Sequence, residues 1–167
     1  MTGTLTAQQA YDVVARVVDP ELPVVTIAEL GILRDVRMDT DGTAVEVDIT
    51  PTYSGCPALE AIEADVEVAL RAAGAEDVRV HTVLTPAWST DLISAEGRRK
   101  LAEAGVAPPP RDRQVPREGP VRLALSVRCP RCGSPDTREV TRFGPTPCTS
   151  LHTCAACLEP FEHVKRL

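Results

Sequence analysis

Two C-x-x-C pairs near the C-terminus constrain the fold of this chain more than any other feature. The pairs are Cys129-Pro130-Arg131-Cys132 and Cys154-Ala155-Ala156-Cys157, with 21 residues between them. Each pair forms a turn in which two sulfurs converge on one ion, and two such turns complete a tetrahedral site of four thiolates. A segment of about 40 residues cannot build a self-sufficient apolar core. We therefore expect a structural metal ion held by Cys129, Cys132, Cys154 and Cys157.

The sequence around these pairs predicts a zinc ribbon. Residues 123–127 and 161–164 have the apolar, β-branched pattern of short strands that flank such a site. Zinc is the expected ion, although four thiolates also accept iron or an iron–sulfur cluster. Two disulfides are the poorer alternative, because they are rare in the cytoplasm where this chain is expected to reside.

Three other side chains of this region are alternative ligands. Cys148 is predicted to be a small buried residue of a ribbon turn, or else a spare thiolate that competes for the metal or helps to transfer it. His152 and His163 are expected to be structural or exposed, because four cysteines already complete the site.

A proline-rich segment divides the chain. Residues 108–120 contain five prolines in thirteen positions, which cannot continue a helix or form a central strand. We predict a first domain over 1–107, a linker over 108–120 and a ribbon domain over 121–167. Residues 1–107 carry 8 Lys and Arg against 18 Asp and Glu, whereas residues 108–167 carry 10 against 6.

Composition narrows the class of protein. The 167 residues are 43% hydrophobic and 25% charged, which is typical of a globular chain. No apolar run approaches the roughly 18–20 residues of a membrane span, and the N-terminus lacks the pattern of a signal peptide, so a cytoplasmic location is expected. The net charge of −6 argues against nucleic acid as a partner, despite the arginines of the ribbon.

The first domain has the predicted order α-β-β-α-β-α, and the fold class is therefore α+β with a ribbon appended. The first helix follows a capping box at Thr6 and Gln9 and extends to Val18, and prolines after Asp19 stop it. Strands over 33–38 and 44–50 form a hairpin around Asp41-Gly42. A helix to about residue 73, a strand over 78–84 and a helix over 94–104 complete it.

Cys56 is the candidate reactive group of this domain. It lies in Gly55-Cys56-Pro57, between a strand and a helix, and Pro57 favours the first helical position. Backbone N–H groups and the helix dipole are expected to stabilise a thiolate there, although a cysteine that merely packs is the alternative. Asp19, Glu21 and His81 are the candidates for a nearby base. Trp88, the only tryptophan, is expected to wall the site or contact a partner, or else to anchor the packing.

These motifs resemble a known family. Asp19-Pro20-Glu21-Leu22-Pro23, residues 27–33 and Gly55-Cys56-Pro57 resemble the SufT-like domain of iron–sulfur cluster assembly proteins. Residues 51–57, 86–91 and 105–109, together with the ribbon, resemble the PaaD-type subunit of the bacterial phenylacetate-degradation system. The resemblance covers nearly the whole chain. It maps the family cysteine onto Cys56 and the acidic motif onto Asp19 and Glu21.

The resemblance implies an accessory protein rather than a stand-alone enzyme. Its expected work is to mature or insert the iron–sulfur cluster of the phenylacetyl-CoA epoxidase, with the iron–sulfur reductase as the principal partner and Cys56 as a transient ligand of iron or a cluster. The alternative is a non-catalytic docking subunit of the oxygenase complex. The opposite charges of the two parts also suit self-association, so a homo-oligomer is a further expectation.

Overall fold

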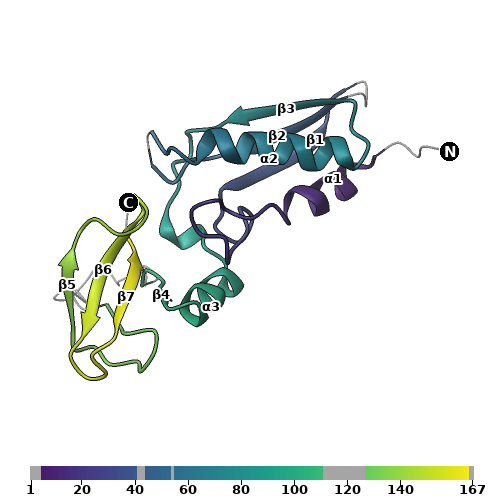
Figure 1. Cartoon of the computed structure of the whole chain (residues 1–167). Coiled ribbons are helices and arrows are strands. Elements are labelled where there is room, and N and C mark those ends of the chain that lie inside the picture. The colour runs from purple at the N-terminus through teal and green to yellow at the C-terminus, as the bar shows by residue number, and fades with distance from the viewer. Residues whose placement is uncertain (1–4, 41–43, 54, 111–126, 166–167) are drawn as a thin grey trace, which may run out of the picture. The chain divides into compact units, whose positions relative to one another are not determined.

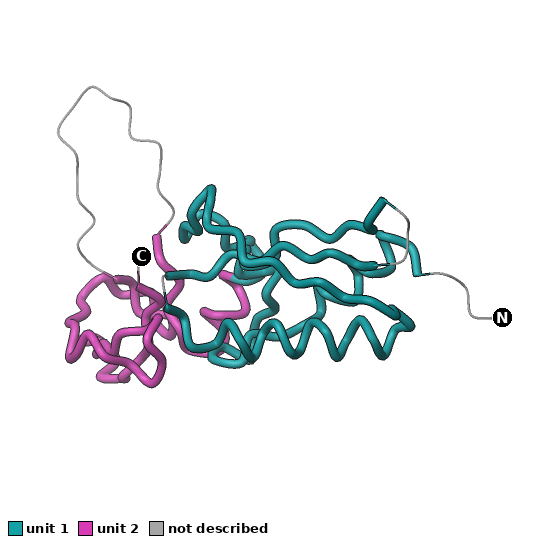
Figure 2. The backbone as a smooth tube through the Cα atoms, turned by 90° about the horizontal axis from the view of Figure 1, so that it is seen from above, with its two compact units in different colours: residues 1–97 teal, residues 98–167 magenta. Residues whose placement is uncertain are grey.

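The computed structural model describes residues 5–40, 44–53, 55–110 and 127–165. The chain forms two compact units, residues 1–97 and 98–167, which Figures 1 and 2 distinguish. The second unit begins at Arg98, ahead of the proline-rich segment. Most of the predicted linker lies outside the described residues, so the division into 1–107, 108–120 and 121–167 stays a prediction.

The first unit alternates helices and strands as the sequence predicts. Its elements are α1 (Ala7–Val14), β1 (Leu33–Met38), β2 (Ala44–Ile49), α2 (Leu59–Ala72), β3 (Asp77–Thr82), a 3₁₀ turn (Thr90–Leu92) and the start of α3 (Ala95–Glu103). The α+β class is confirmed. The hairpin turn predicted at Asp41-Gly42 lies outside the described residues.

A three-stranded sheet in the order β1-β2-β3 organises this unit. Strands β1 and β2 are antiparallel, whereas β2 and β3 are parallel and are joined through α2, so β2, α2 and β3 form a βαβ unit. Helix α1 packs against β1 and α2, and α2 packs against β3 (Figure 1). The core between them is aliphatic; its largest fully buried members are Ile27, Ile49, Ile62, Leu70, Val14, Val25, Val45, Val47 and Val66.

Helix α1 is shorter than predicted. The capping box is confirmed, because Thr6 accepts from the Gln9 backbone and the Gln9 side chain accepts from Thr6 N–H. The helix ends at Val14, and the prediction that it reaches Val18 is wrong. Val18 forms a β-bridge with Thr26, and the Val17 carbonyl accepts from Ile27 N–H at 2.9 Å. This pairing draws the backbone out of the helix before the prolines are reached.

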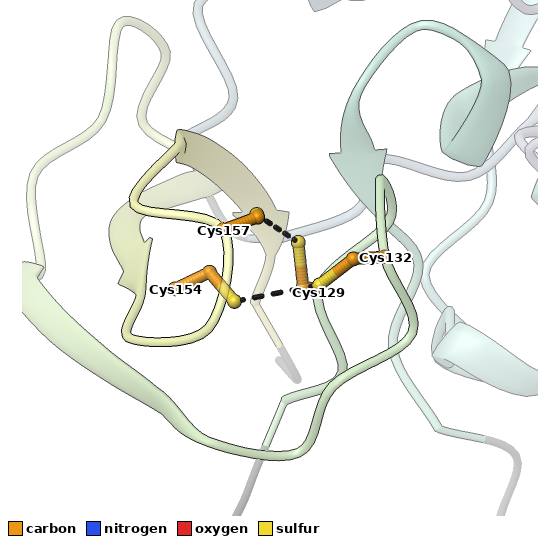
Figure 3. Close-up of side chains that lie close together, drawn as sticks. All are labelled: Cys129, Cys132, Cys154 and Cys157. Atoms are coloured by element: carbon orange, nitrogen blue, oxygen red, sulfur yellow. Dashed lines mark hydrogen bonds between the residues drawn. The ribbon is translucent and has the colours of Figure 1, made fainter.

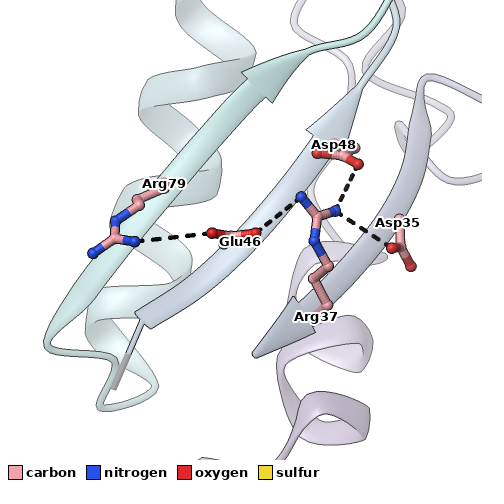
Figure 4. Close-up of polar contacts among 5 residues, drawn as sticks. All are labelled: Asp35, Arg37, Glu46, Asp48 and Arg79. Atoms are coloured by element: carbon pink, nitrogen blue, oxygen red, sulfur yellow. Dashed lines mark hydrogen bonds and ion pairs between the residues drawn. The ribbon is translucent and has the colours of Figure 1, made fainter. Parts of the chain in front are cut away.

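Charged side chains cover the other face of the sheet (Figure 4). Arg37 pairs with Asp48 at 2.6 Å, Glu46 at 2.9 Å and Asp35 at 3.4 Å, and Arg79 extends the network to Glu46 at 3.8 Å. These groups are partly exposed, so each pair contributes little to stability. The network marks this face as solvated and leaves the helices on the apolar face.

The second unit is built on a four-stranded sheet. Its strands are β4 (Val106–Ala107), β5 (Thr137–Thr141), β6 (Thr149–Cys154) and β7 (Pro160–Val164), in the order β4-β7-β6-β5. The strand predicted over 161–164 is confirmed as β7, whereas residues 123–126 of the other predicted strand lie outside the described residues. β5 and β6 were not predicted, and neither was β4, which pairs in parallel with β7.

The apolar core of this unit is small. Ala107, Cys129, Cys154 and Phe161 are buried together, and Val127 and Cys157 pack against them. Half of these six side chains are cysteines of the two C-x-x-C pairs. The metal-ligand region and the core are therefore the same place. Within the described ranges, no helix has the length and hydropathy of a membrane-spanning segment.

Candidate functional site

The four distal cysteines converge in the second unit. Their Sγ atoms all lie within 4.8 Å of one another, with Cys129 and Cys157 3.7 Å apart and Cys132 and Cys154 3.6 Å apart (Figure 3). Four thiolates held at about 2.3 Å from a tetrahedral zinc ion are separated by about 3.8 Å. The sulfur positions therefore fit one zinc ion, and all six cysteines of the chain are outside disulfides.

Electrostatics also favours a cation among these sulfurs. N–H groups of Cys157 and Ala156 donate to Cys154 and lower its pKa to about 7 against the effect of burial. Ser134 N–H donates to Cys132, yet desolvation and the three neighbouring sulfurs raise the pKa of Cys132 to about 12. Four crowded thiols cannot all ionise without a compensating positive charge. A divalent ion supplies that charge, and soft thiolate ligands favour zinc.

The other predicted alternatives stay outside this group. Cys148 is buried and its sulfur lies 3.2 Å from Thr146 Oγ1, as expected for a residue of a turn. His152 and His163 are buried side chains of β6 and β7. Among the described residues, only the four cysteines form a group that can hold a metal ion.

Cys56 lies in the connection between β2 and α2. In parallel βαβ units this edge, outside the carboxyl ends of the strands, is where ligands bind. Cys56 N–H donates to the Tyr53 carbonyl at 3.3 Å and the Cys56 carbonyl accepts from Leu59 N–H at 3.3 Å, so the backbone on both sides is fixed. The side chain is half-buried. Gly55 before it has φ +84 and open space where a side chain would stand, which leaves room for a ligand.

The acidic motif forms a tight turn near this cysteine. Asp19 is 5% exposed, and its Oδ1 accepts from Glu21 N–H at 2.9 Å and from Leu22 N–H at 2.7 Å. Burial nevertheless raises the pKa of Asp19 above its usual value. Asp19 therefore shapes the turn, which presents Glu21 beside it.

The structure brings Cys56, Asp19 and Glu21 together. Burial is the main cause that raises the Cys56 pKa, and the negative charges of Glu21 and Asp19 raise it further. Ala58 N–H and the Thr52 hydroxyl donate to the sulfur and oppose this shift. The expectation of a stabilised thiolate is therefore wrong. The reason is that α2 begins only at Leu59, with Ala58 as its N-cap, so few helix N–H groups reach the sulfur.

Comparison with known proteins covers both parts of the chain. Residues 7–95 match the family of iron–sulfur cluster assembly proteins, and residues 114–165 match the PaaD zinc beta ribbon domain. The chain is also 36% identical over 166 residues to an Escherichia coli K12 protein assigned as a subunit of the 1,2-phenylacetyl-CoA epoxidase, covering 98% of this chain and 96% of that protein. The chain belongs to the PaaD family.

Two further similarities concern the first domain of this PaaD-family chain. An Fe-S protein maturation auxiliary factor, YitW of Bacillus subtilis 168, is 41% identical over 80 residues, 47% of this chain and 76% of that protein. A crystal structure of a DUF59 domain from Bacillus anthracis, 30% identical, superposes with a TM-score of 0.52 over 57% of this chain and 90% of that one. The α+β fold around Cys56 is thus shared with these proteins.

The remaining predicted candidates lie elsewhere in the PaaD-family fold. His81 stands on β3 opposite Asp48 and is not among the groups that shift the Cys56 pKa. Trp88 is 7% exposed and its Nε1 donates to the Leu30 carbonyl at 2.9 Å, which makes it a packing anchor. A buried indole cannot offer a partner much surface.

Sequence reasoning missed two groups that act on Cys56. They are the Thr52 hydroxyl and the backbone N–H of Ala58. Thr52 could have been noticed, because a hydroxyl four residues before a cysteine in a tight loop is within reach of its sulfur. The N–H of Ala58 carries no sequence signal.

Proposed function

We propose that this PaaD-family chain is an accessory protein that matures or inserts the iron–sulfur cluster of the phenylacetyl-CoA epoxidase system. The observation that carries the proposal is the position of Cys56, half-buried beside Asp19 and Glu21, in a domain that matches iron–sulfur cluster assembly proteins. The named relatives support it, one as an epoxidase subunit and one as a maturation factor.

In this proposal Cys56 is a transient ligand of iron or of a cluster, which is cargo and not a resident group. The raised pKa keeps Cys56 a thiol at neutral pH. When iron arrives, the S–H bond breaks, an S–Fe bond forms, and the proton passes to the nearby Glu21 carboxylate or to water. Because the thiolate is not intrinsically stabilised, the same equilibrium favours release to an acceptor.

The ribbon has a different part in the proposal. Cys129, Cys132, Cys154 and Cys157 would hold one zinc ion, which supplies the folding free energy that the small apolar core lacks. We assign cluster chemistry to the first unit and partner binding to the ribbon. The proposed acceptor is the iron–sulfur reductase of the epoxidase system.

The test is the cluster content of the reductase purified from cells that carry Cys56→Ala. We expect iron and acid-labile sulfide per reductase to fall well below the wild-type level. Cys148→Ala is the matched control, since it removes a thiol that lies outside both sites, and loading there should be unchanged. Full loading with Cys56→Ala contradicts the proposal and leaves the alternative, a docking subunit without cluster chemistry.

A further inference from the structure

The two C-x-x-C turns of the ribbon have the same backbone geometry but differ at one residue. In the first turn Gly133 N–H donates to the Cys129 carbonyl at 2.9 Å, and in the second Leu158 N–H donates to the Cys154 carbonyl at 3.0 Å. The residue after the second cysteine has positive φ in both, +74 for Gly133 and +64 for Leu158. One turn thus has the residue that this conformation favours, and the other has leucine.

Leucine at this position is unfavourable for the isolated chain. A side chain in the left-handed region brings Cβ against the backbone, and bulky residues are found there rarely. Among the described residues, Leu158 is the only one other than glycine with a positive φ. Its side chain is 80% exposed, so burial within the chain does not compensate. An unfavourable backbone under an exposed apolar side chain points to a contact outside the chain.

The neighbours of Leu158 extend this apolar surface. Ala155, Ala156 and Pro160 are also exposed, and with Leu158 they form what we call the knuckle patch. The patch adjoins Cys157, so the metal site fixes its backbone. Rigid, small and apolar, it has the character of an anchor that enters a pocket of a partner.

Charges around the knuckle patch indicate the chemistry of that partner. Arg131 stands 3.9 Å from Glu159 and is 57% exposed, Arg128 donates to the Gly133 carbonyl at 3.1 Å, and Arg138 lies opposite Thr153 at the same end of the sheet. The acidic groups here are Glu159 and Asp136, whose carbonyl accepts from Ala155 N–H. Three arginines against two carboxylates favour a partner surface with an acidic rim.

We propose that Leu158 is the anchor of a protein-docking surface, the knuckle patch, which inserts into an apolar pocket with an acidic rim on the cluster-receiving protein. This inference rests on the proposed function for the identity of that protein, the iron–sulfur reductase of the epoxidase system. A nucleic acid fits less well, because the patch has no aromatic side chain on which a base could stack.

The test measures binding of the zinc-loaded full-length chain to the purified, cluster-free reductase by calorimetry. Leu158→Gly suits the backbone conformation and removes the anchor, so we expect about a tenfold or greater rise in Kd. Zinc per chain should stay unchanged, and the thermal midpoint of the ribbon should stay the same or rise. Phe143→Ser is the matched control: Phe143 is 83% exposed but follows β5, away from the knuckle, and Kd should change less than twofold.

Several results would overturn this inference. An unchanged Kd for Leu158→Gly removes the anchor, and an equal loss with Phe143→Ser makes the contact a non-specific apolar one. Loss of zinc or a lower midpoint in Leu158→Gly makes the leucine structural. Self-association of the wild type that Leu158→Gly abolishes, without reductase binding, makes a second copy the occupant.

The docking inference and the proposed function fail separately. Cys56→Ala should bind the reductase with wild-type Kd but deliver no cluster, whereas Leu158→Gly should deliver clusters once its concentration is raised. Delivery by Cys56→Ala with intact binding contradicts the proposed function and leaves the docking surface standing. Delivery that needs Cys56 but no measurable reductase binding by the wild type contradicts the docking surface alone.

Discussion

At the scale of single residues, the Cys56 site is set by competition between burial and hydrogen bonds. Burial and the charges of Glu21 and Asp19 raise the pKa of the thiol, and two donors, Ala58 N–H and Thr52, lower it. A helix N-terminus alone would have favoured a thiolate. The acidic turn reverses that preference because it places carboxylates, not cations, near the sulfur. The chemistry of this cysteine is therefore a property of the loop opposite it.

Neutralising Glu21 should make Cys56 more acidic. In Glu21→Gln a negative charge that disfavours the thiolate is lost, so the Cys56 pKa should fall and its alkylation near neutral pH should become faster. Iodoacetamide labelling across pH, read for the Cys56 peptide by mass spectrometry, gives the apparent pKa directly.

The matched control for this prediction is Glu60→Gln. It removes one carboxylate from the first turn of α2, and Glu60 is not among the groups that shift the Cys56 pKa. A pH profile that moves equally in both variants would mean that overall charge, and not the acidic turn, governs the cysteine.

At the scale of elements, sequence periodicity predicts those that bury an apolar face. β2 alternates buried Val45 and Val47 with Glu46 and Asp48, and α2 buries Ile62 and Val66, so both were found. Their bounds and those of β3 differ from prediction by a few residues.

Elements whose stability comes from other sources could not be predicted. β5 and β6 are rich in threonine and serine, and their packing depends on the cysteine cluster and not on an apolar stripe. β4 has two residues, and its pairing with β7 is non-local. Cys56, Asp19 and Glu21 were singled out from motifs, but their mutual electrostatics arises only from the tertiary fold.

A buried histidine gives the β6–β7 pair a dependence on pH. His163 is 9% exposed, its Nε2 has no hydrogen-bond partner among the described residues, and its ring meets His152 edge-on at 5.3 Å. Burial, with a smaller effect of His152, lowers the His163 pKa to about 4. In the unfolded chain the group titrates near 6.5, so the unfolded state binds the proton first as pH falls.

The stability of β6 and β7 should therefore fall between about pH 6.5 and pH 4. Between pH 7 and pH 5 we expect the wild type to lose about 1–2 kcal/mol more than His163→Phe, which keeps a buried ring without a titrating nitrogen. Amide hydrogen exchange of β6 and β7, corrected for intrinsic rates, measures this difference. His81→Gln, an exposed histidine of the other unit, should behave like the wild type, and equal losses in His163→Phe would assign the acid sensitivity to the metal thiolates instead.

At the scale of the whole molecule, two units achieve stability by different means. The first unit buries an extensive aliphatic core between α1, α2 and the sheet. The second buries only a handful of apolar side chains, half of them cysteines of the two C-x-x-C turns. Small domains of this kind need a staple, and the four sulfurs are spaced to hold one. The stability of one unit should accordingly depend on metal and that of the other should not.

Removal of the metal should unfold the second unit alone. The purified chain should contain about one zinc ion per molecule by elemental analysis. After treatment with a strong chelator, amides of β5, β6 and β7 should exchange at nearly unprotected rates, because metal binding is folding free energy for such modules. Trp88 is buried in the first unit, so its fluorescence and its thermal midpoint should stay at their metal-loaded values.

Cysteine substitutions separate the staple from other effects of the chelator. Cys154→Ser should reproduce the chelated state without chelator, since Cys154 is fully buried within the cluster. Cys148→Ser should keep the zinc and the exchange protection, because Cys148 lies outside the cluster and contacts Thr146. A ribbon that stays protected without metal would mean that its few apolar side chains suffice. Collapse of the Trp88 signal on chelation would mean that the first unit depends on the ribbon for its own fold.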